Sequence, residues 1–169
     1  MTRSLLGALA AVLAIPLAAF THAPVAVGPP WISIEYPVNP YDATTRDAFL
    51  QVNAYHHGTP VTIPVGGTAE GLVDGKRQSI TLDFGRTSRT GIYALRKQWP
   101  DQGTWSLVIW VEQGKDDRAT ALVELGADGR VARVDVPTRR QDGWVIPAGV
   151  AMRDVEAGLL ARSRALVRR

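Results

Sequence analysis

The sequence of 169 residues contains no cysteine, only two methionines and only three histidines. Without cysteine, the chain forms no disulfide and has neither a thiol nucleophile nor the thiolate ligands of zinc fingers and iron–sulfur clusters. Compact catalytic motifs are missing too, including Gly-x-Ser-x-Gly, His-Glu-x-x-His and phosphate-binding glycine loops. Because few histidines are available to act as bases, the sequence predicts a protein that is not an enzyme.

The excess of one sign of charge over the other is also small, because the chain has 19 basic and 16 acidic residues. The small excess is unevenly distributed. Residues 150–169 hold five basic and two acidic residues, whereas residues 24–149 hold 13 basic and 14 acidic ones. The basic character of the protein therefore belongs to its C-terminal segment. The hydrophobic fraction of 46% is high enough to predict a folded core rather than disorder.

The first 23 residues have the order of a secretory signal peptide. Arg3 supplies positive charge, residues 5–19 contain no charged residue, and small residues follow. The apolar stretch is shorter than the roughly 20 residues of a membrane-spanning helix, and Pro16 would interrupt such a helix near its end. We predict that residues 1–23 direct export to the periplasm or the extracellular space. Because Pro24 follows the expected cleavage point, an uncleaved, membrane-tethered form is the alternative.

From residue 24 to residue 137, apolar and polar residues alternate in short runs, which is the period of a half-buried β-strand. No helical segment separates the runs, and turn residues such as Asp74-Gly75 end them. The pattern predicts an antiparallel, immunoglobulin-like β-sandwich of seven or eight strands, with an N-terminal signal helix and a C-terminal amphipathic helix. The runs are residues 31–36, 47–57, 61–73, 78–84, 91–99, 104–112, 119–125 and 131–136.

Two pairs of these runs are predicted to form hairpins. Residues 91–99 and 104–112 flank a turn at Pro100-Asp101-Gln102-Gly103. Residues 119–125 and 131–136 flank the turn Gly126-Ala127-Asp128-Gly129.

Residues 138–169 have a different pattern, which predicts a linker and a basic amphipathic helix. Apolar residues at spacings of three, four and seven form one helical face. Acidic residues precede the arginines along it, as the helix dipole favours. The apolar positions are Met152, Val155, Leu159 and Leu166, and the arginines are Arg162, Arg164, Arg168 and Arg169.

Five tryptophans suggest both a core and a recognition surface. Trp99 and Trp105 lie in apolar patterns and are expected in the core. Trp31, Trp110 and Trp144 have polar neighbours and are candidates for an interaction surface. The alternative is that the outer sheet face that carries them packs beneath the C-terminal helix or the N-terminal segment.

The four C-terminal arginines are also candidates for that surface, where they would contact anionic lipid or a partner. The alternative is that they form a solvated helix end. No interleaving of aromatic and basic residues marks a nucleic-acid surface. We therefore expect a protein partner in the envelope or outside the cell, with possible membrane contact through the signal segment or the C-terminal helix, and no nucleic acid.

His56 and His57 are the candidate metal ligands, for copper or zinc; no other cofactor is expected. Neighbouring strand residues point to opposite faces, so one metal would need a bulge and carboxylates from elsewhere. The available carboxylates are Glu70, Asp74 and Asp83. The alternative is that the two histidines form a polar strand end that leads into the Gly58-Thr59-Pro60 turn.

A longer motif runs from Gly91-Ile92-Tyr93 through Trp99-Pro100 to Gly103-Thr104-Trp105-Ser106-Leu107. It resembles the YtkA-like group of small exported bacterial domains and, more distantly, the immunoglobulin-like domains of periplasmic copper-resistance proteins. The resemblance extends over residues 31–113 and implies no activity. It implies structural roles for Gly91, Tyr93, Trp99, Gly103 and Trp105, with Tyr93 as a corner tyrosine. The histidine and methionine clusters of the copper proteins are missing here.

Three functions follow from these patterns. The main prediction is an exported, non-enzymatic β-sandwich that binds a protein or envelope partner. The first alternative is a metal-binding or metal-delivery domain that uses His56 and His57. The second is a carbohydrate-active hydrolase, which would need two converging carboxylates.

Overall fold

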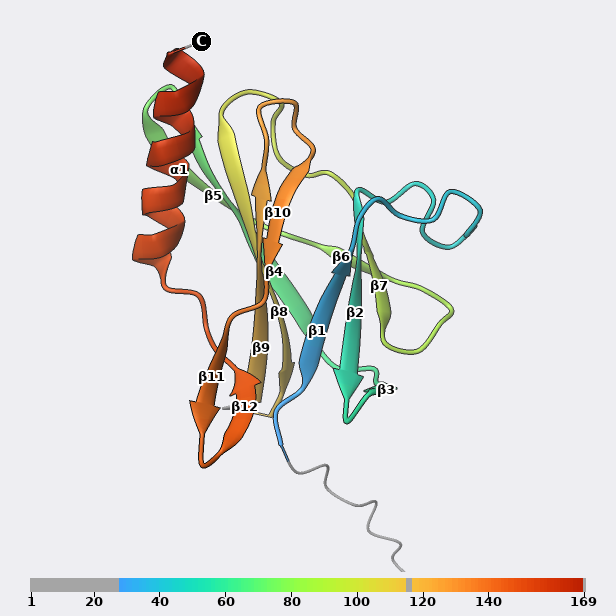
Figure 1. The fold of residues 1–169 in the computed structure, drawn as a ribbon. Helices are drawn as coiled ribbons and strands as arrows, with labels where there is room; N and C mark the ends of the chain where they lie inside the picture. Colours follow the sequence, from blue (N-terminus) through green and yellow to red (C-terminus); the bar gives the residue numbers. More distant parts are fainter. Residues whose placement is uncertain (1–27, 115–116, 169) are drawn as a thin grey trace, which may run out of the picture.

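The computed structural model describes residues 28–114 and 117–168, which form three antiparallel sheets and one helix (Figure 1). The predicted signal peptide, residues 1–23, lies outside the described residues. The predicted antiparallel sandwich with a helix after it is confirmed, although the strands are more numerous than the alternation indicated.

Two five-stranded sheets make up the sandwich. In spatial order, the first sheet contains β1 (Trp31–Glu35), β2 (Leu50–His56), β7 (Ile92–Leu95) and β6 (Phe84–Arg86), with β3 (Thr59–Pro60) paired to β2. The second sheet contains β10 (Val131–Asp135), β9 (Asp117–Leu125), β8 (Thr104–Gln113), β4 (Val65–Val73) and β5 (Lys76–Thr81). A separate hairpin joins β11 (Thr138–Gln141) to β12 (Trp144–Pro147), and α1 (Met152–Val167) follows.

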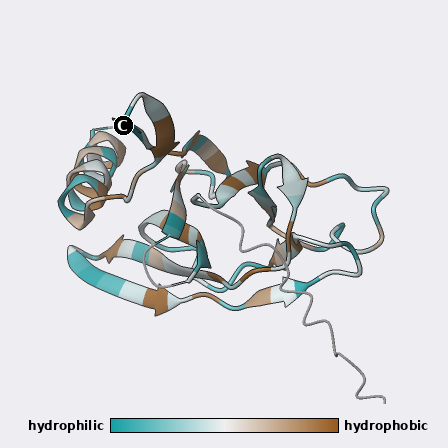
Figure 2. Ribbon diagram, turned by 90° about the horizontal axis from the view of Figure 1, so that it is seen from below, coloured by the Kyte–Doolittle hydropathy of each residue, from teal (hydrophilic) through white to brown (hydrophobic). Residues whose placement is uncertain are grey.

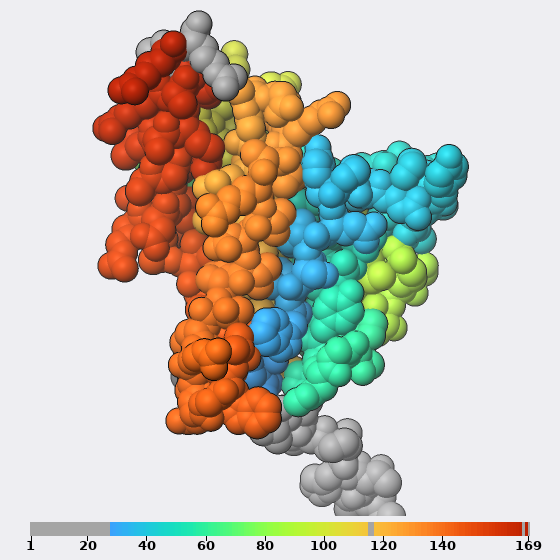
Figure 3. Space-filling view, in the orientation of Figure 1, coloured from blue at the N-terminus to red at the C-terminus, as the bar shows by residue number. Residues whose placement is uncertain are grey.

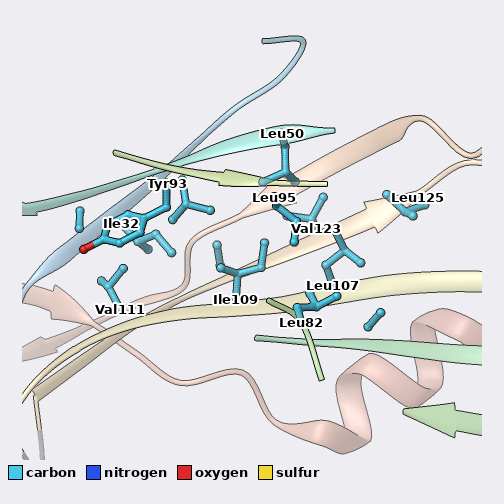
Figure 4. Packing of buried hydrophobic residues seen from close by; sticks show 14 of the residues in the cluster. Ile32, Leu50, Leu82, Tyr93, Leu95, Leu107, Ile109, Val111, Val123 and Leu125 are labelled. Carbon is cyan, nitrogen blue, oxygen red and sulfur yellow. The ribbon is translucent and has the colours of Figure 1, made fainter. Parts of the chain in front are cut away.

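The core lies between the first and second sheets (Figure 4). Every second residue of β2 points into it, as the alternation predicted, including the fully buried Leu50 and Val52. From the other side, β8 contributes Leu107, Ile109 and Val111, all fully buried. Burial of apolar surface on this scale is the main stabilising term of the sandwich.

The predicted hairpin of residues 91–99 with residues 104–112 is wrong. β7 pairs with β2 and β6 in the first sheet, whereas β8 pairs with β4 and β9 in the second. The intervening segment crosses from one sheet to the other. Trp99 in this segment is buried and packs edge-on against Phe49, with ring centroids 5.0 Å apart. Alternation did not reveal the crossover because both strands face the same core from opposite sides.

The run at residues 78–84 was also predicted as one strand, and the structure divides it between two sheets. β5 ends at Thr81, and β6 begins at Phe84. Leu82 lies between them and is buried in the core. Most of β5 is exposed, and its first residues are hydrophilic in Figure 2. The predicted hairpin of residues 119–125 with residues 131–136 is confirmed by the pairing of β9 with β10.

Residues 138–147 were predicted as part of a linker, but they form the β11–β12 hairpin. Its turn residues Asp142 and Gly143 both have a positive φ, 51° and 82°. This is the geometry of a two-residue turn that matches the twist of the flanking strands. The sequence signal was therefore present as an Asp-Gly pair between short extended segments.

α1 packs on the outer face of the second sheet and lies at one side of the sandwich (Figures 1 and 2). Val155 and Leu159 are buried against Leu72 and Val108, and Trp110 packs beside them. For Trp110, this confirms the alternative expectation: the outer sheet face that carries it packs beneath the C-terminal helix. The apolar face of α1 is thus used for intramolecular packing.

Candidate functional site

Arg162 fixes α1 to the second sheet and is not part of an exposed surface. Its guanidinium donates to Glu124 at 2.6 Å, to the hydroxyl of Ser106 at 2.5 Å and to the carbonyl of Trp105 at 3.4 Å. Nearer the start of the helix, Arg77 bridges Glu70 and Glu156 at 3.1 and 3.2 Å. The part of the outer face formed by β4 and β8 is therefore covered by packing and by ion pairs.

We expect Arg162→Ala to lower the free energy of unfolding by about 2 kcal/mol. The substitution leaves the buried Ser106 and the Glu124 carboxylate, which is 22% exposed, without their shared donor. Arg164 is exposed on the same helix, and Arg164→Ala is the matched control, with an expected loss below about 0.5 kcal/mol. Urea denaturation measures both; equal losses would show that the Arg162 contacts stabilise nothing.

The outer face of the first sheet is the open side of the sandwich, and no helix or sheet of residues 28–114 and 117–168 packs over it as α1 does over the second. In Figure 3 the blue-to-teal surface of this region faces outward, away from the red helix. The register of β1 and β2 places three pairs of side chains on it: Trp31 with Tyr55, Ser33 with Asn53, and Glu35 with Gln51. We call these six residues, together with Arg89, the polar face.

Hydrogen bonds hold the centre of the polar face in place. Gln51 donates to Glu35 and to Asn53, both at 2.7 Å, and Asn53 donates to Ser33 at 3.2 Å. Gln51 is only 3% exposed and Asn53 only 8%. Buried amides are costly unless they are paired, so this network fixes the rotamers of the surrounding side chains.

Arg89 links two loops across one end of the polar face. It donates to the side-chain oxygen Oε1 of Gln51 at 3.1 Å and forms an ion pair with Asp42. The pKa of Asp42 lies below its usual value, mainly because the hydroxyl of Thr44 and then its backbone N–H donate to the carboxylate; Arg89 adds a smaller effect. Tyr41, beside Asp42, is 94% exposed.

Sequence reasoning identified Trp31 but missed the polar residues around it. Alternation assigns Ser33, Glu35, Gln51 and Asn53 to outward positions, but it does not say which strands are neighbours. Only the register of β1 with β2 brings these positions together.

The two candidate metal ligands are close together. His57 follows the end of β2 with a φ of 48°, and its ring packs edge-on against His56, with centroids 4.3 Å apart. The expectation that the rings point to opposite faces is therefore wrong, because His57 has left the strand. His56 is buried, and its Nε2 lies 3.2 Å from the carbonyl oxygen of Gly28.

No group of three potential ligands gathers among the described residues. Glu70, one of the carboxylates considered, instead accepts hydrogen bonds from Arg77 and Ser79 on the second sheet. Binding of copper or zinc stays a prediction.

The other predicted surface residues are dispersed and do not form one surface. Trp110 lies under α1, with the Arg118 guanidinium 4.9 Å from its ring centroid. Trp144 is 76% exposed on the β11–β12 hairpin. Arg164 and Arg168 are exposed near the end of α1, at the opposite end of the molecule from that hairpin (Figure 1), and Arg169 lies outside the described residues.

Contacts in the structure fit the structural roles expected for the motif residues. Tyr93 donates from its hydroxyl to the carbonyl of Ile63 at 2.6 Å, which ties β7 to the segment before β4. The Trp105 indole donates to the carbonyl of Gln102 at 2.8 Å. Trp99 and Trp105 are both buried, as expected. Gly103 has a φ of 92°, a conformation that favours glycine.

A hollow of about 280 Å³ lies at the end of the sandwich that carries the turns of residues 100–103 and 126–129. Trp99 and Trp105 line it together with Lys97 and two aspartates. Asp101 is paired with Lys97, and Asp128 accepts the backbone N–H of Arg130 at 3.0 Å. Both carboxylates thus take part in contacts with residues near them in the chain.

Comparison with family models, curated proteins and solved structures found no match. The resemblance to YtkA-like domains therefore stays a prediction. Within residues 28–114 and 117–168, no helix is long and apolar enough to span a membrane.

Proposed function

We propose that the protein is an exported, non-enzymatic binding module and that the polar face is where it binds a protein partner of the cell envelope. The observation that carries the proposal is the difference between the two outer faces. α1 covers β4 and β8 at the centre of the second sheet, whereas the first sheet presents an ordered set of side chains without a helix over them.

The chemistry of the polar face suits protein recognition. The buried amides of Gln51 and Asn53 hold the partly exposed Glu35 and Ser33 in place, so binding through these two side chains would cost little side-chain entropy. Trp31 and Tyr55 lie opposite each other at one end, and both are partly exposed. Aromatic residues of this kind commonly dominate the binding energy of protein interfaces. Arg89 and Glu35 add charges of both signs, which favours a polar partner surface.

Photo-crosslinking in the producing cells tests the proposal. A photoreactive phenylalanine analogue at position 55 should give a discrete crosslinked product, whereas the same analogue at Arg153, exposed on α1, should give none. Trp31→Ala, combined with the label at position 55, should weaken binding about tenfold or more. Circular dichroism checks that each variant is folded. Absence of a product at position 55, or equal products at both positions, would contradict the proposal.

A further inference from the structure

The β11–β12 hairpin projects from the sandwich with all of its turn-proximal side chains exposed. Residues 138–145 are exposed without exception, including Trp144 at 76% and Val145 at 48%. Arg139 and Arg140 precede the turn on the paired strand. The register places Arg139 on the face of Trp144 and Arg140 on the opposite face with Val145. Each face of the hairpin thus presents one arginine and one exposed apolar side chain near the turn.

The hairpin lies at the same end of the molecule as Gly28, the first described residue (Figures 1 and 3). In the sequence, only residues 20–27 separate Gly28 from the apolar segment of residues 5–19. Eight residues span at most about 28 Å when fully extended. While the apolar segment is held in a membrane, this end of the sandwich is therefore kept close to the bilayer.

We propose that the β11–β12 hairpin docks on the headgroups of an anionic membrane. Tryptophan favours the interface between water and lipid, where its ring is buried and its N–H stays hydrated. Arginine close to an anionic bilayer contributes roughly fivefold to binding. Trp144 is the interfacial anchor, and Arg139 and Arg140 contact the lipid phosphates.

The other charges of the hairpin are compatible with this orientation. Asp142 at the turn carries a negative charge, so the two arginines leave the hairpin with a net charge of +1. Arg139 also donates to the side chain of Gln141 at 3.0 Å and to the carbonyl of Pro147 at 3.4 Å. The C-terminal end of α1, which carries the exposed Arg164 and Arg168, lies at the other end of the molecule (Figure 1). The hairpin, rather than the C-terminal helix, therefore makes the lipid contact.

The absence of cysteine makes a direct test possible, because one introduced cysteine gives a single labelling site. We would place an environment-sensitive nitrobenzoxadiazole dye at Gln141→Cys in the full chain, made by cell-free synthesis. The matched control is Ala127→Cys, an exposed position in the turn at the opposite end. Both proteins are mixed with vesicles of phosphatidylcholine alone and of phosphatidylcholine with phosphatidylglycerol in equal parts.

We expect the emission of the dye at position 141 to rise and shift to the blue with phosphatidylglycerol, and to reverse at high salt. The dye at position 127 should not respond. Arg139→Gln with Arg140→Gln should lower the ratio of docked to undocked hairpin about 25-fold, and Trp144→Ala should lower it as well.

Equal responses at positions 141 and 127, or a response that does not depend on phosphatidylglycerol, would overturn the proposal. These outcomes are independent of the crosslinking at position 55, so each proposal can fail alone.

Discussion

Gly91→Ala is expected to lower the free energy of unfolding by about 3 kcal/mol, whereas Gly75→Ala should cost only about 1 kcal/mol. The two glycines have nearly the same backbone conformation, with φ of 72° and 75°. A Cβ on Gly75 meets nothing within 4 Å. A Cβ on Gly91 would lie 2.7 Å from the carbonyl oxygen of Ala54 and 2.9 Å from the backbone nitrogen of Val61.

The extra cost at Gly91 arises because both obstacles are backbone atoms. Ala54 donates to the Gly91 carbonyl at 2.8 Å and accepts from Val61 at 3.0 Å. Relieving the clash must displace these groups, and each weakened hydrogen bond costs about 1 kcal/mol. Left-handed strain, about 1 kcal/mol, is common to both variants.

Urea denaturation followed by tryptophan fluorescence measures both variants, and the slope of the transition checks that they remain two-state. Gly75→Ala is the control for strain alone. Losses that are equal within error would mean that the segment before β7 yields to the added methyl group, against our expectation.

Leu159→Ala should lower the free energy of unfolding by about 3 kcal/mol, and Leu160→Ala by less than about 1 kcal/mol. The two leucines are neighbours on α1 with equal helix propensity. Leu159 is fully buried with Leu72, Val108 and Val155, so its truncation leaves a cavity between helix and sheet. Leu160 is 45% exposed, so little apolar surface returns to water.

Thermal and urea unfolding give the size of the difference, and limited proteolysis reports whether α1 stays docked. In Leu159→Ala we expect cleavage within α1 before the sandwich is cut, because the helix loses its central contact. Comparable stability of the two variants would be evidence against packing of α1 on the second sheet.

Patterns with local causes were predicted well. The inward residues of β2 and β8, the β9–β10 hairpin and the helix at residues 152–167 all follow from alternation or helical spacing. The two errors in strand organisation, at residues 78–84 and 91–112, have one cause. In both places the chain crosses between the sheets, and apolar alternation is the same on either side of a shared core.

The candidate site was predictable only in part for a related reason. The outward assignment of Gln51 and Asn53 needed only the strand period, but their pairing with Glu35 and Ser33 depends on contacts 16 to 20 residues apart. Arg162 was predicted on an exposed basic surface because it is one of four arginines near the end of the helix. Its partner Glu124 is 38 residues away, and no local pattern indicates that pairing.

The sequence by itself determined that the protein is a cysteine-free antiparallel β-sandwich with a helix after it, because strand and helix periodicity are local properties of the chain. The tertiary structure decided which outer face is covered and which stays open. Docking of α1 depends on the fit of Val155 and Leu159 to the second sheet and on the reach of Arg162. These are long-range contacts, so only the folded chain makes the first sheet the open face.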